Sequence, residues 1–315
     1  MSKSASAIQY NFSAGTFKNT RLIEGLGLQL MKLSAKMTKP IEYTGMSVAH
    51  RLLRTMLPSN RFIEMQMLPD TKFVFPYGDA YWGVLLDNST GYSPEVENFL
   101  MGLKDEEFCF IDCGANYGYM SAIMTSQAYG SKPSIAIEAD PDTYKILKAN
   151  AEINKNRFEI RNRAIFSKSG EMVDMRGTKH EARSILDENG NMQNGNVETL
   201  ALNDLTTWIE AQGTDKVMLK LDVEGVEIDA MKGAQELLKK DLLVFYEDHA
   251  SDKSHEVSRY FMETLGMRVF YPDVETCDEI KKLEDIDKVK TNPRIGYDFA
   301  ATNSPHWLKA LQQPV

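Results

Sequence analysis

The stretch that decides the fold is Phe110–Met120, which reads FIDCGANYGYM. It begins as a buried strand and breaks, directly after Asp112, into a turn with glycines at Gly114 and Gly118. Glycine lets the backbone pass close to a ligand, and the helix that follows offers unpaired amide N–H groups. The spacing is not the G-x-G-x-x-G of a dinucleotide loop, and a carboxylate at the mouth repels phosphate. The stretch therefore favours a ligand with an ammonium or sulfonium group. A turn that needs glycine for its geometry alone is the alternative.

Alternating strand and helix patterns continue from this stretch to about residue 304. Strands are expected at 108–112, 134–138, 157–162, 216–221, 242–247, 267–271 and 296–301, and helices at 116–128, 141–152, 226–239 and 254–265. This alternation predicts a mostly parallel sheet with helices on both faces. Polar residues 172–200 interrupt it, and their Asn/Gly-rich tip at 189–196 predicts an inserted loop or hairpin.

Ligands of open α/β sheets bind beyond the carboxyl ends of the strands, so the residues that end each strand are candidates for the site. Glu138 ends the second strand, twenty residues after Gly118, where an acid typically accepts hydrogen bonds from a ribose diol. Asp140, before Pro141, is either the cap of the next helix or a ligand contact. With Asp112, these residues predict a site for S-adenosylmethionine (SAM). A nicotinamide dinucleotide site is the competing interpretation.

The fourth strand ends in charged side chains, within VMLKLDVEGVE. Lys220, Asp222 and Glu224 fall on one face because side chains alternate along a strand. Carboxylates at the end of a buried strand are costly unless they are paired or used, which favours a function. The alternative is that Lys220 pairs with Asp222 and that Glu224 caps the next helix.

The fifth strand, LLVFYEDHA, ends in Glu247, Asp248 and His249. A histidine just past a strand end can serve as a general base because its pKa lies near neutrality. It can equally be an exposed loop residue.

Six segments resemble, in order, the motifs of the FkbM-type SAM-dependent methyltransferases: FIDCGANYGYMSAI, AIEADPDTYKILKANAEIN, NRAIFSKSGE, VETLALNDL, KLDVEGVEIDAMKGA and VFYEDH. The resemblance covers about residues 70–300, with GYSPEVENFL as its lead-in. It implies an α/β fold with a Rossmann-like class I methyltransferase sheet of seven strands, the last one antiparallel. MRVFYP and IGYDFAATN would supply the closing pair. One departure is Asn203, where the family more often has aspartate.

The resemblance also implies roles for individual residues. Asp112, Gly114, Asn116, Gly118 and Glu138 would hold SAM, and Asp222 would lie where cofactor and acceptor meet. Family members typically methylate hydroxyl groups on sugars, polyketides or related small molecules. We therefore expect an O-methyltransferase that acts on a sugar, a glycan or a related molecule. A catalytically inactive SAM-binding scaffold or regulator, and an enzyme for a lipid or lipid-linked substrate, are the alternatives.

Two chemical roles remain open for the strand-end residues. Methyl transfer to a hydroxyl requires a base, which is His249 or Asp222 in one hypothesis, with Glu224 positioning the hydroxyl. In the other, Asp222 and Glu224, together with Glu247 or Asp248, bind Mg²⁺, which would acidify the hydroxyl.

The N-terminal 61 residues differ in charge from the rest of the chain. They hold nine Lys or Arg against two acids, whereas the whole chain has a net charge of −9, so the remainder carries −16. An acidic body argues against nucleic acid as a partner. Helices are expected at 21–37 and 47–58, with Leu22, Leu26, Leu30 and Leu33 at helical spacing. The segment is expected to pack on the core, cover the substrate or join a homodimer; peripheral membrane contact through residues 21–57 is the alternative.

These observations predict four parts: a basic helical extension (1–61, with 1–20 poorly ordered), lead-in strands and a helix (62–107), the methyltransferase domain (108–304, with the insertion at 172–200) and a tail (305–315). Cys109 and Cys113 lie too far apart along one strand for a disulfide. The sequence shows neither a signal peptide nor an apolar run of membrane-spanning length. A cytoplasmic location is expected, with attachment to the inner face of the membrane as the alternative.

Overall fold

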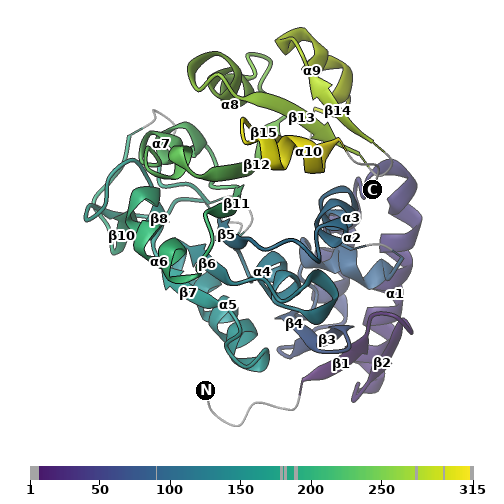
Figure 1. The fold of residues 1–315 in the computed structure, drawn as a ribbon. Helices are drawn as coiled ribbons and strands as arrows, with labels where there is room; N and C mark the ends of the chain where they lie inside the picture. Colours follow the sequence, from purple (N-terminus) through teal and green to yellow (C-terminus); the bar gives the residue numbers. More distant parts are fainter. Residues whose placement is uncertain are drawn as a thin grey trace.

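The computed structural model describes residues 7–89, 91–177, 180, 183–187, 191–273, 276–293 and 295–312. Its central feature is an eight-stranded sheet in the order β14-β13-β15-β12-β11-β5-β6-β7 (Figure 1). The strands are β5 (Cys109–Cys113), β6 (Ser134–Glu138), β7 (Glu159–Asn162), β11 (Lys216–Leu221), β12 (Asp241–His249), β13 (Arg268–Pro272), β14 (Cys277–Ile280) and β15 (Gly296–Thr302).

Strands β7, β6, β5, β11 and β12 are parallel, and β15 runs antiparallel between β12 and β13. The predicted arrangement with an antiparallel last strand is therefore confirmed. The predicted count of seven strands is wrong, because β14 pairs antiparallel with β13 at the edge. Its sequence, CDEI, is short and charged, as is usual for an exposed edge strand, and so it lacks the apolar run that marks the central strands.

The order of the strands places the ligand crevice between β5 and β11. From β5, the chain continues outward to β6 and β7 on one side and later returns to β11 and β12 on the other. Such a reversal leaves a crevice at the carboxyl ends of the two central strands. All five residues of β5 and of β6 are buried, as expected of parallel strands covered on both faces.

Helices cover this sheet and are shorter than predicted at several places. They are α3 (Pro94–Gly102), α4 (Tyr119–Met124), α5 (Pro141–Ile153), α6 (Thr206–Ala211), α7 (Glu227–Lys232), α8 (Glu256–Arg259), α9 (Leu283–Val289) and α10 (Pro305–Leu311). A π-helical turn, Tyr260–Thr264, continues α8. Helix α10 lies in the predicted tail. Ser304 caps its N-terminus by accepting a hydrogen bond from the backbone N–H of Trp307, and the Trp307 indole packs against Phe108.

The N-terminal segment contains strands as well as helices. Strands β1 (Ile8–Asn11) and β2 (Thr16–Lys18) join β3 (Phe62–Leu68) and β4 (Thr71–Pro76) in a second sheet of order β2-β1-β3-β4. The expectation of poor order is therefore wrong for residues 8–18, whereas residues 1–6 lie outside the described part of the chain. IQYN alternates buried and exposed side chains, a strand signal that the Ser/Asn-rich composition hid.

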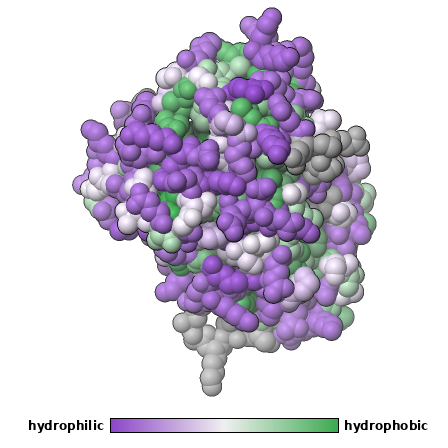
Figure 2. All heavy atoms as spheres, viewed as in Figure 1, coloured by the Kyte–Doolittle hydropathy of each residue, from purple (hydrophilic) through white to green (hydrophobic). Residues whose placement is uncertain are grey.

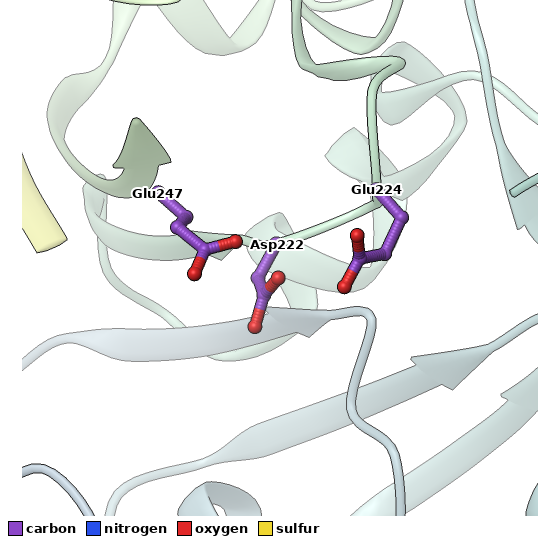
Figure 3. Close-up of side chains that lie close together, drawn as sticks. All are labelled: Asp222, Glu224 and Glu247. Atoms are coloured by element: carbon purple, nitrogen blue, oxygen red, sulfur yellow. The ribbon is translucent and has the colours of Figure 1, made fainter. Parts of the chain in front are cut away.

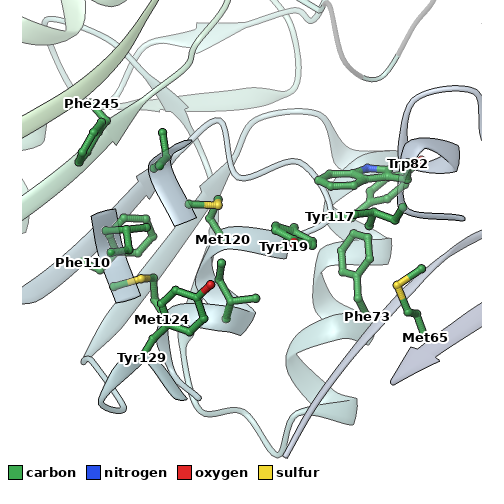
Figure 4. Close-up of a cluster of buried hydrophobic side chains, with 14 of the residues drawn as sticks. Met65, Phe73, Trp82, Phe110, Tyr117, Tyr119, Met120, Met124, Tyr129 and Phe245 are labelled. Atoms are coloured by element: carbon green, nitrogen blue, oxygen red, sulfur yellow. The ribbon is translucent and has the colours of Figure 1, made fainter. Parts of the chain in front are cut away.

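Two helices follow β2, α1 (Leu22–Thr38) and α2 (Met46–Met56), which confirms the two predicted helices. The core-facing side of α1 is formed by Gly27, Leu28, Met31 and Ala35. The leucines noted in the sequence at helical spacing, Leu22, Leu26, Leu30 and Leu33, are exposed. The N-terminal segment shares one apolar core with the large sheet, which includes Met65, Phe73, Phe110 and Phe245 (Figure 4).

Two strands of the polar insertion, β9 (Met172–Val173) and β10 (Val197–Leu200), join β8 (Ala164–Ile165), which precedes the insertion, in a small sheet of order β8-β10-β9. Isolated bridges join Arg176 to Ser184 and Leu186 to Met192. Part of the predicted Asn/Gly-rich tip, 189–190, lies outside the described residues. The three cysteines are free, and no helix within the described ranges is long and apolar enough to cross a membrane.

Candidate active site

A pocket lies in the crevice beyond β5, β6 and β11. Its walls come from the turn after β5, the end of β6, residues 163–165, the insertion and residues 220–226. Tyr81, Trp82 and Tyr92, which precede the large sheet, close one side. The pocket thus gathers residues from segments more than 140 positions apart in the chain.

Asp112 reaches this pocket from the carboxyl end of β5 and is 1% exposed. Its Oδ2 accepts hydrogen bonds from the backbone N–H (3.2 Å) and hydroxyl (2.7 Å) of Ser121, whereas Oδ1 is buried without a partner. Burial raises the pKa of the carboxyl group, and the nearby Lys220 ammonium opposes that rise. A buried carboxylate oxygen that lacks a donor is costly, and a cationic ligand group would satisfy it.

The two glycines of the turn have different roles. Gly114 lines the pocket at φ +74°, and a Cβ there would lie 1.7 Å from the backbone oxygen of Asp222. Its role is to let the turn after β5 pass against the end of β11. Gly118, at φ +84°, lies outside the pocket lining, and a Cβ there would lie 2.4 Å from Leu147. The structure therefore does not bring Gly118 to the proposed cofactor, because it faces the helix that packs on α4.

Asn116 lines the pocket in the left-handed region, at φ 51°. Its Oδ1 accepts hydrogen bonds from Trp82 Nε1 (3.0 Å) and from the Tyr117 amide (2.8 Å). Its Nδ2 lies 3.2 Å from His180 Nδ1. The side chain therefore joins the turn after β5 to the aromatic wall and to the insertion, and so braces this side of the pocket.

Glu138 lies at the end of β6 and faces the pocket. Its two oxygens accept hydrogen bonds from the amides of Asn116 and Asp140, both at 2.8 Å. Each oxygen retains acceptor capacity for a ribose hydroxyl. Asp140 instead caps α5 through Thr143 (2.8 Å) and pairs with Arg183. It lies outside the pocket lining, so the structure shows the cap that the sequence offered as one of two roles.

A pH dependence of SAM affinity is expected from Glu138. Burial raises the pKa of this carboxyl group to about 7. Ionisation turns the O–H donor of the acid into a second strong acceptor oxygen, so SAM affinity should rise with pH through 7 and then level off. Binding should be about tenfold weaker at pH 6 than at pH 8.

Calorimetry across this range would measure the effect, with Glu138→Gln as the control that removes the titrating group. An identical pH dependence in both proteins would show that ionisation of Glu138 does not govern SAM binding.

Sequence reasoning missed an Asp–His pair beside the pocket. His180, from the insertion, lines the pocket and places Nε2 3.1 Å from Asp79 Oδ2. Its ring stacks on Tyr117 at 4.7 Å. Asp79 is 7% exposed and also accepts hydrogen bonds from the amides of Tyr81 and Trp82. The aromatic-rich run PYGDAYW, which contains Asp79, was a sequence signal for this side of the pocket. The partner of Asp79, His180, lies about a hundred residues further along the chain.

The Lys220–Asp222 ion pair is present, as the more conservative interpretation expected. Lys220 Nζ lies 2.9 Å from Asp222 Oδ2, and both side chains line the pocket. Asp222, with Asp112, raises the pKa of Lys220 despite its burial, so the ammonium stays protonated. Glu224 is not the N-cap of α7, as the alternative interpretation proposed, because that position is Val226. Glu227 accepts hydrogen bonds from the amides of Val223 and Gly225.

Three carboxylates converge at the end of β11 and β12. One oxygen each of Asp222, Glu224 and Glu247 lies within 4.8 Å of the others (Figure 3). Burial, with Asp222 as the largest charged contribution, raises the pKa of Glu247 to about 9. This cluster would share a proton or bind a cation, because three such charges repel one another in a poorly solvated site.

Asp248 and His249 do not join this cluster. Asp248 is 1% exposed, and its Oδ1 lies 2.5 Å from Lys290 Nζ while Ser258 donates to Oδ2. It is not a metal ligand here, because alternation along β12 turns it to the face opposite Glu247. The exposed side chain of His249 bonds to Ser251 Oγ (2.7 Å) and lies outside the pocket lining. The structure therefore does not place His249 where a base is needed.

Comparison with solved structures finds similar chains at low sequence identity. Methyltransferase FkbM from Methylobacillus flagellatus is 14% identical (TM-score 0.38), over 62% of this chain and 43% of that one. A SAM-dependent methyltransferase from Agrobacterium tumefaciens is 13% identical (TM-score 0.38; 78% and 70% covered). P. horikoshii TYW2 in complex with MeSAdo is also 13% identical (TM-score 0.37; 81% of each chain covered).

No curated protein matches this sequence. The family model described as Methyltransferase FkbM domain matches residues 112–269, which make up half of the chain. The match begins at Asp112 and spans the strand ends that form the pocket. The chain belongs to the FkbM methyltransferase family.

Proposed function

We propose that this methyltransferase transfers a methyl group from SAM to a hydroxyl group of a sugar, a glycan or a related small molecule. The observation that carries the proposal is the pocket itself. Its lining contains Asp112, which would bind a cationic group, and Glu138, which would bind a ribose diol. It also contains a third acid, Asp222, at the end of β11. A dinucleotide is disfavoured, because its phosphates would face these carboxylates.

The residues present fit the cofactor. Asp112 Oδ1 is buried without a hydrogen-bond donor and would accept a hydrogen bond from the ammonium group of the methionine part. Glu138 would hold the ribose diol. Gly114 allows the turn after β5 to pack closely against the end of β11. Bound SAM would supply an electrophilic methyl group on a sulfonium.

The acceptor end of the site is assigned to Asp222 and its two carboxylate neighbours. Asp222 would accept the hydroxyl proton. Its ion pair with Lys220 would hold the Asp222 side chain in place. Glu224 and Glu247 would orient the hydroxyl, and protonated Glu247 can donate a hydrogen bond. Alignment of the hydroxyl accounts for most of the rate that such a site provides.

As a second possibility for the acceptor end, the three carboxylates would bind a divalent cation, which would neutralise their negative charge. Asp222, Glu224 and Glu247 offer three carboxylate oxygens close enough to share one ion, and oxygen ligands are those that Mg²⁺ prefers. An ion there would acidify the acceptor hydroxyl.

Formation of S-adenosylhomocysteine from SAM, with a panel of sugars, glycans and other hydroxyl acceptors, tests the proposal. We expect turnover with at least one hydroxyl acceptor and none with amine or thiol analogues of it. Turnover that survives EDTA assigns the acceptor end to proton transfer alone, whereas loss restored by Mg²⁺ assigns it to the cation. SAM binding without turnover on any acceptor would favour a scaffold or regulatory protein.

A further inference from the structure

The helical hairpin α1–α2 exposes an unusual number of large apolar side chains. Ten of the thirteen exposed large hydrophobic residues in the described part of the chain belong to residues 22–56. They are Leu22, Ile23, Leu26, Leu30, Leu33, Met37, Ile41, Val48, Leu52 and Met56. We call these ten side chains the apolar hairpin surface. Isolated exposed leucines are ordinary, but a concentration of this kind marks an interaction surface.

Helix α1 is apolar on two separate faces. One face packs on the core through Gly27, Leu28, Met31 and Ala35. The other carries Leu22, Leu26, Leu30, Leu33 and Met37, whose exposed fractions run from 38% to 92%. At about 100° per residue these five positions form one stripe. A helix that is apolar on both sides normally has a partner on both.

Helix α2 repeats the pattern. Met46 and His50 are buried, whereas Val48, Leu52 and Met56 are 62%, 59% and 67% exposed at four-residue spacing. Helices α1 and α2 pack against each other, and the connection between them adds exposed Ile41. Figure 2 shows hydrophobic side chains on the flank of the molecule along which α1 runs in Figure 1.

The charges of the N-terminal segment that carries this surface are mostly positive. Lys18, Arg21, Lys36, Arg51 and Arg54 are exposed on the same segment. Of its two acids, Glu24 is buried in an ion pair with Arg61 (2.6 Å), and Glu42 bonds to Asn292. A second copy docked through the same surface by two-fold symmetry would bring these cations together. An anionic lipid surface instead complements both the apolar side chains and the charge.

We propose that the apolar hairpin surface docks the protein on the surface of an anionic lipid bilayer. The ten apolar side chains enter the boundary between headgroups and acyl chains, and the surrounding cations contact the headgroups. This inference goes beyond the methyl transfer proposed above and does not depend on it. It assigns the leucine stripe, which the core leaves unused, to a defined partner.

Co-sedimentation of the full chain with vesicles tests the proposal. Vesicles of phosphatidylcholine with phosphatidylglycerol would be compared with vesicles of phosphatidylcholine alone. We expect tight binding to the anionic vesicles, weaker binding to the neutral ones, and partial release at high salt, which screens the charges but not the apolar contacts.

Two variants separate the contributions. Leu30→Gln with Leu33→Gln should lower the affinity for anionic vesicles about tenfold or more. Lys36→Gln with Arg51→Gln should lower it about 25-fold, at about fivefold for each cation. The matched control is Met101→Gln with Met172→Gln, which changes two exposed methionines (45% and 46%) outside the hairpin and should bind as the wild type does. Thermal unfolding and SAM calorimetry on each variant would confirm that the fold and the pocket are intact.

Equal sedimentation of the wild type and both hairpin variants would overturn the proposal. Concentration-dependent self-association of the wild type without vesicles, abolished by Leu30→Gln with Leu33→Gln, would overturn it in favour of contact between copies. Failure of SAM binding with vesicle binding intact would count against the proposed methyl transfer alone.

Discussion

Replacing Asp248 with alanine is expected to lower the free energy of unfolding by about 3–5 kcal/mol. The Asp248 and Lys290 side chains are 1% and 0% exposed, and their charged atoms lie 2.5 Å apart. Lys290 Nζ also contacts the Asp252 backbone oxygen and His255 Nδ1, both at 3.0 Å, and neither carries a full negative charge. The variant would therefore leave a buried ammonium without its counter-charge. Urea unfolding followed by circular dichroism would measure the loss.

Two further variants make this result interpretable. Asp285→Ala removes the partner of exposed Lys288 and should change stability far less, because water screens that pair. Lys290→Met in the Asp248→Ala background should recover much of the lost stability, because it removes the unpaired charge. A loss for Asp248→Ala no larger than that for Asp285→Ala would mean that Lys290 reaches solvent in the variant.

Replacing Asp222 with asparagine is expected to lower kcat by about 10²–10⁴-fold, the usual contribution of a positioned base. Asparagine keeps the size of the side chain but cannot accept the hydroxyl proton. It also removes the charge that holds Lys220 at 2.9 Å. Because Asp112 and Glu138 remain, SAM affinity should change much less than kcat. The measurement is the rate of S-adenosylhomocysteine formation at saturating acceptor, with SAM binding followed by calorimetry.

Two histidine variants serve as comparisons. His249→Gln should keep wild-type kcat, since the side chain is exposed and bonded to Ser251. His180→Gln tests the other group in the pocket that could take a proton, the imidazole held by Asp79. Normal turnover by Asp222→Asn together with loss in His180→Gln would move the proton acceptor from the carboxylate to the imidazole.

Much of the fold and part of the site followed from local sequence patterns. The apolar runs of β5 and β6 predict strands buried on both faces, and the rule that ligands bind at strand ends selects Asp112, Glu138 and Asp222. The strands are present and the three side chains line one pocket, because alternation, burial and chain direction depend on residues close together in the sequence. Lys220 and Asp222 are two positions apart, so their ion pair was also foreseeable.

The tertiary structure decided the features that depend on distant partners. Asp248 and His249 looked equivalent to Glu247 in sequence. In the structure, Asp248 forms a buried ion pair with Lys290, and His249 is exposed to solvent. His180 enters the pocket only because the insertion folds back over the sheet, where Asp79 binds it. The leucines of α1 face outward because the opposite side of that helix packs on the core, where Gly27 allows close approach to Tyr77. Local sequence determines which residues end a strand or line a helix, whereas packing between segments far apart in the chain determines what each side chain meets.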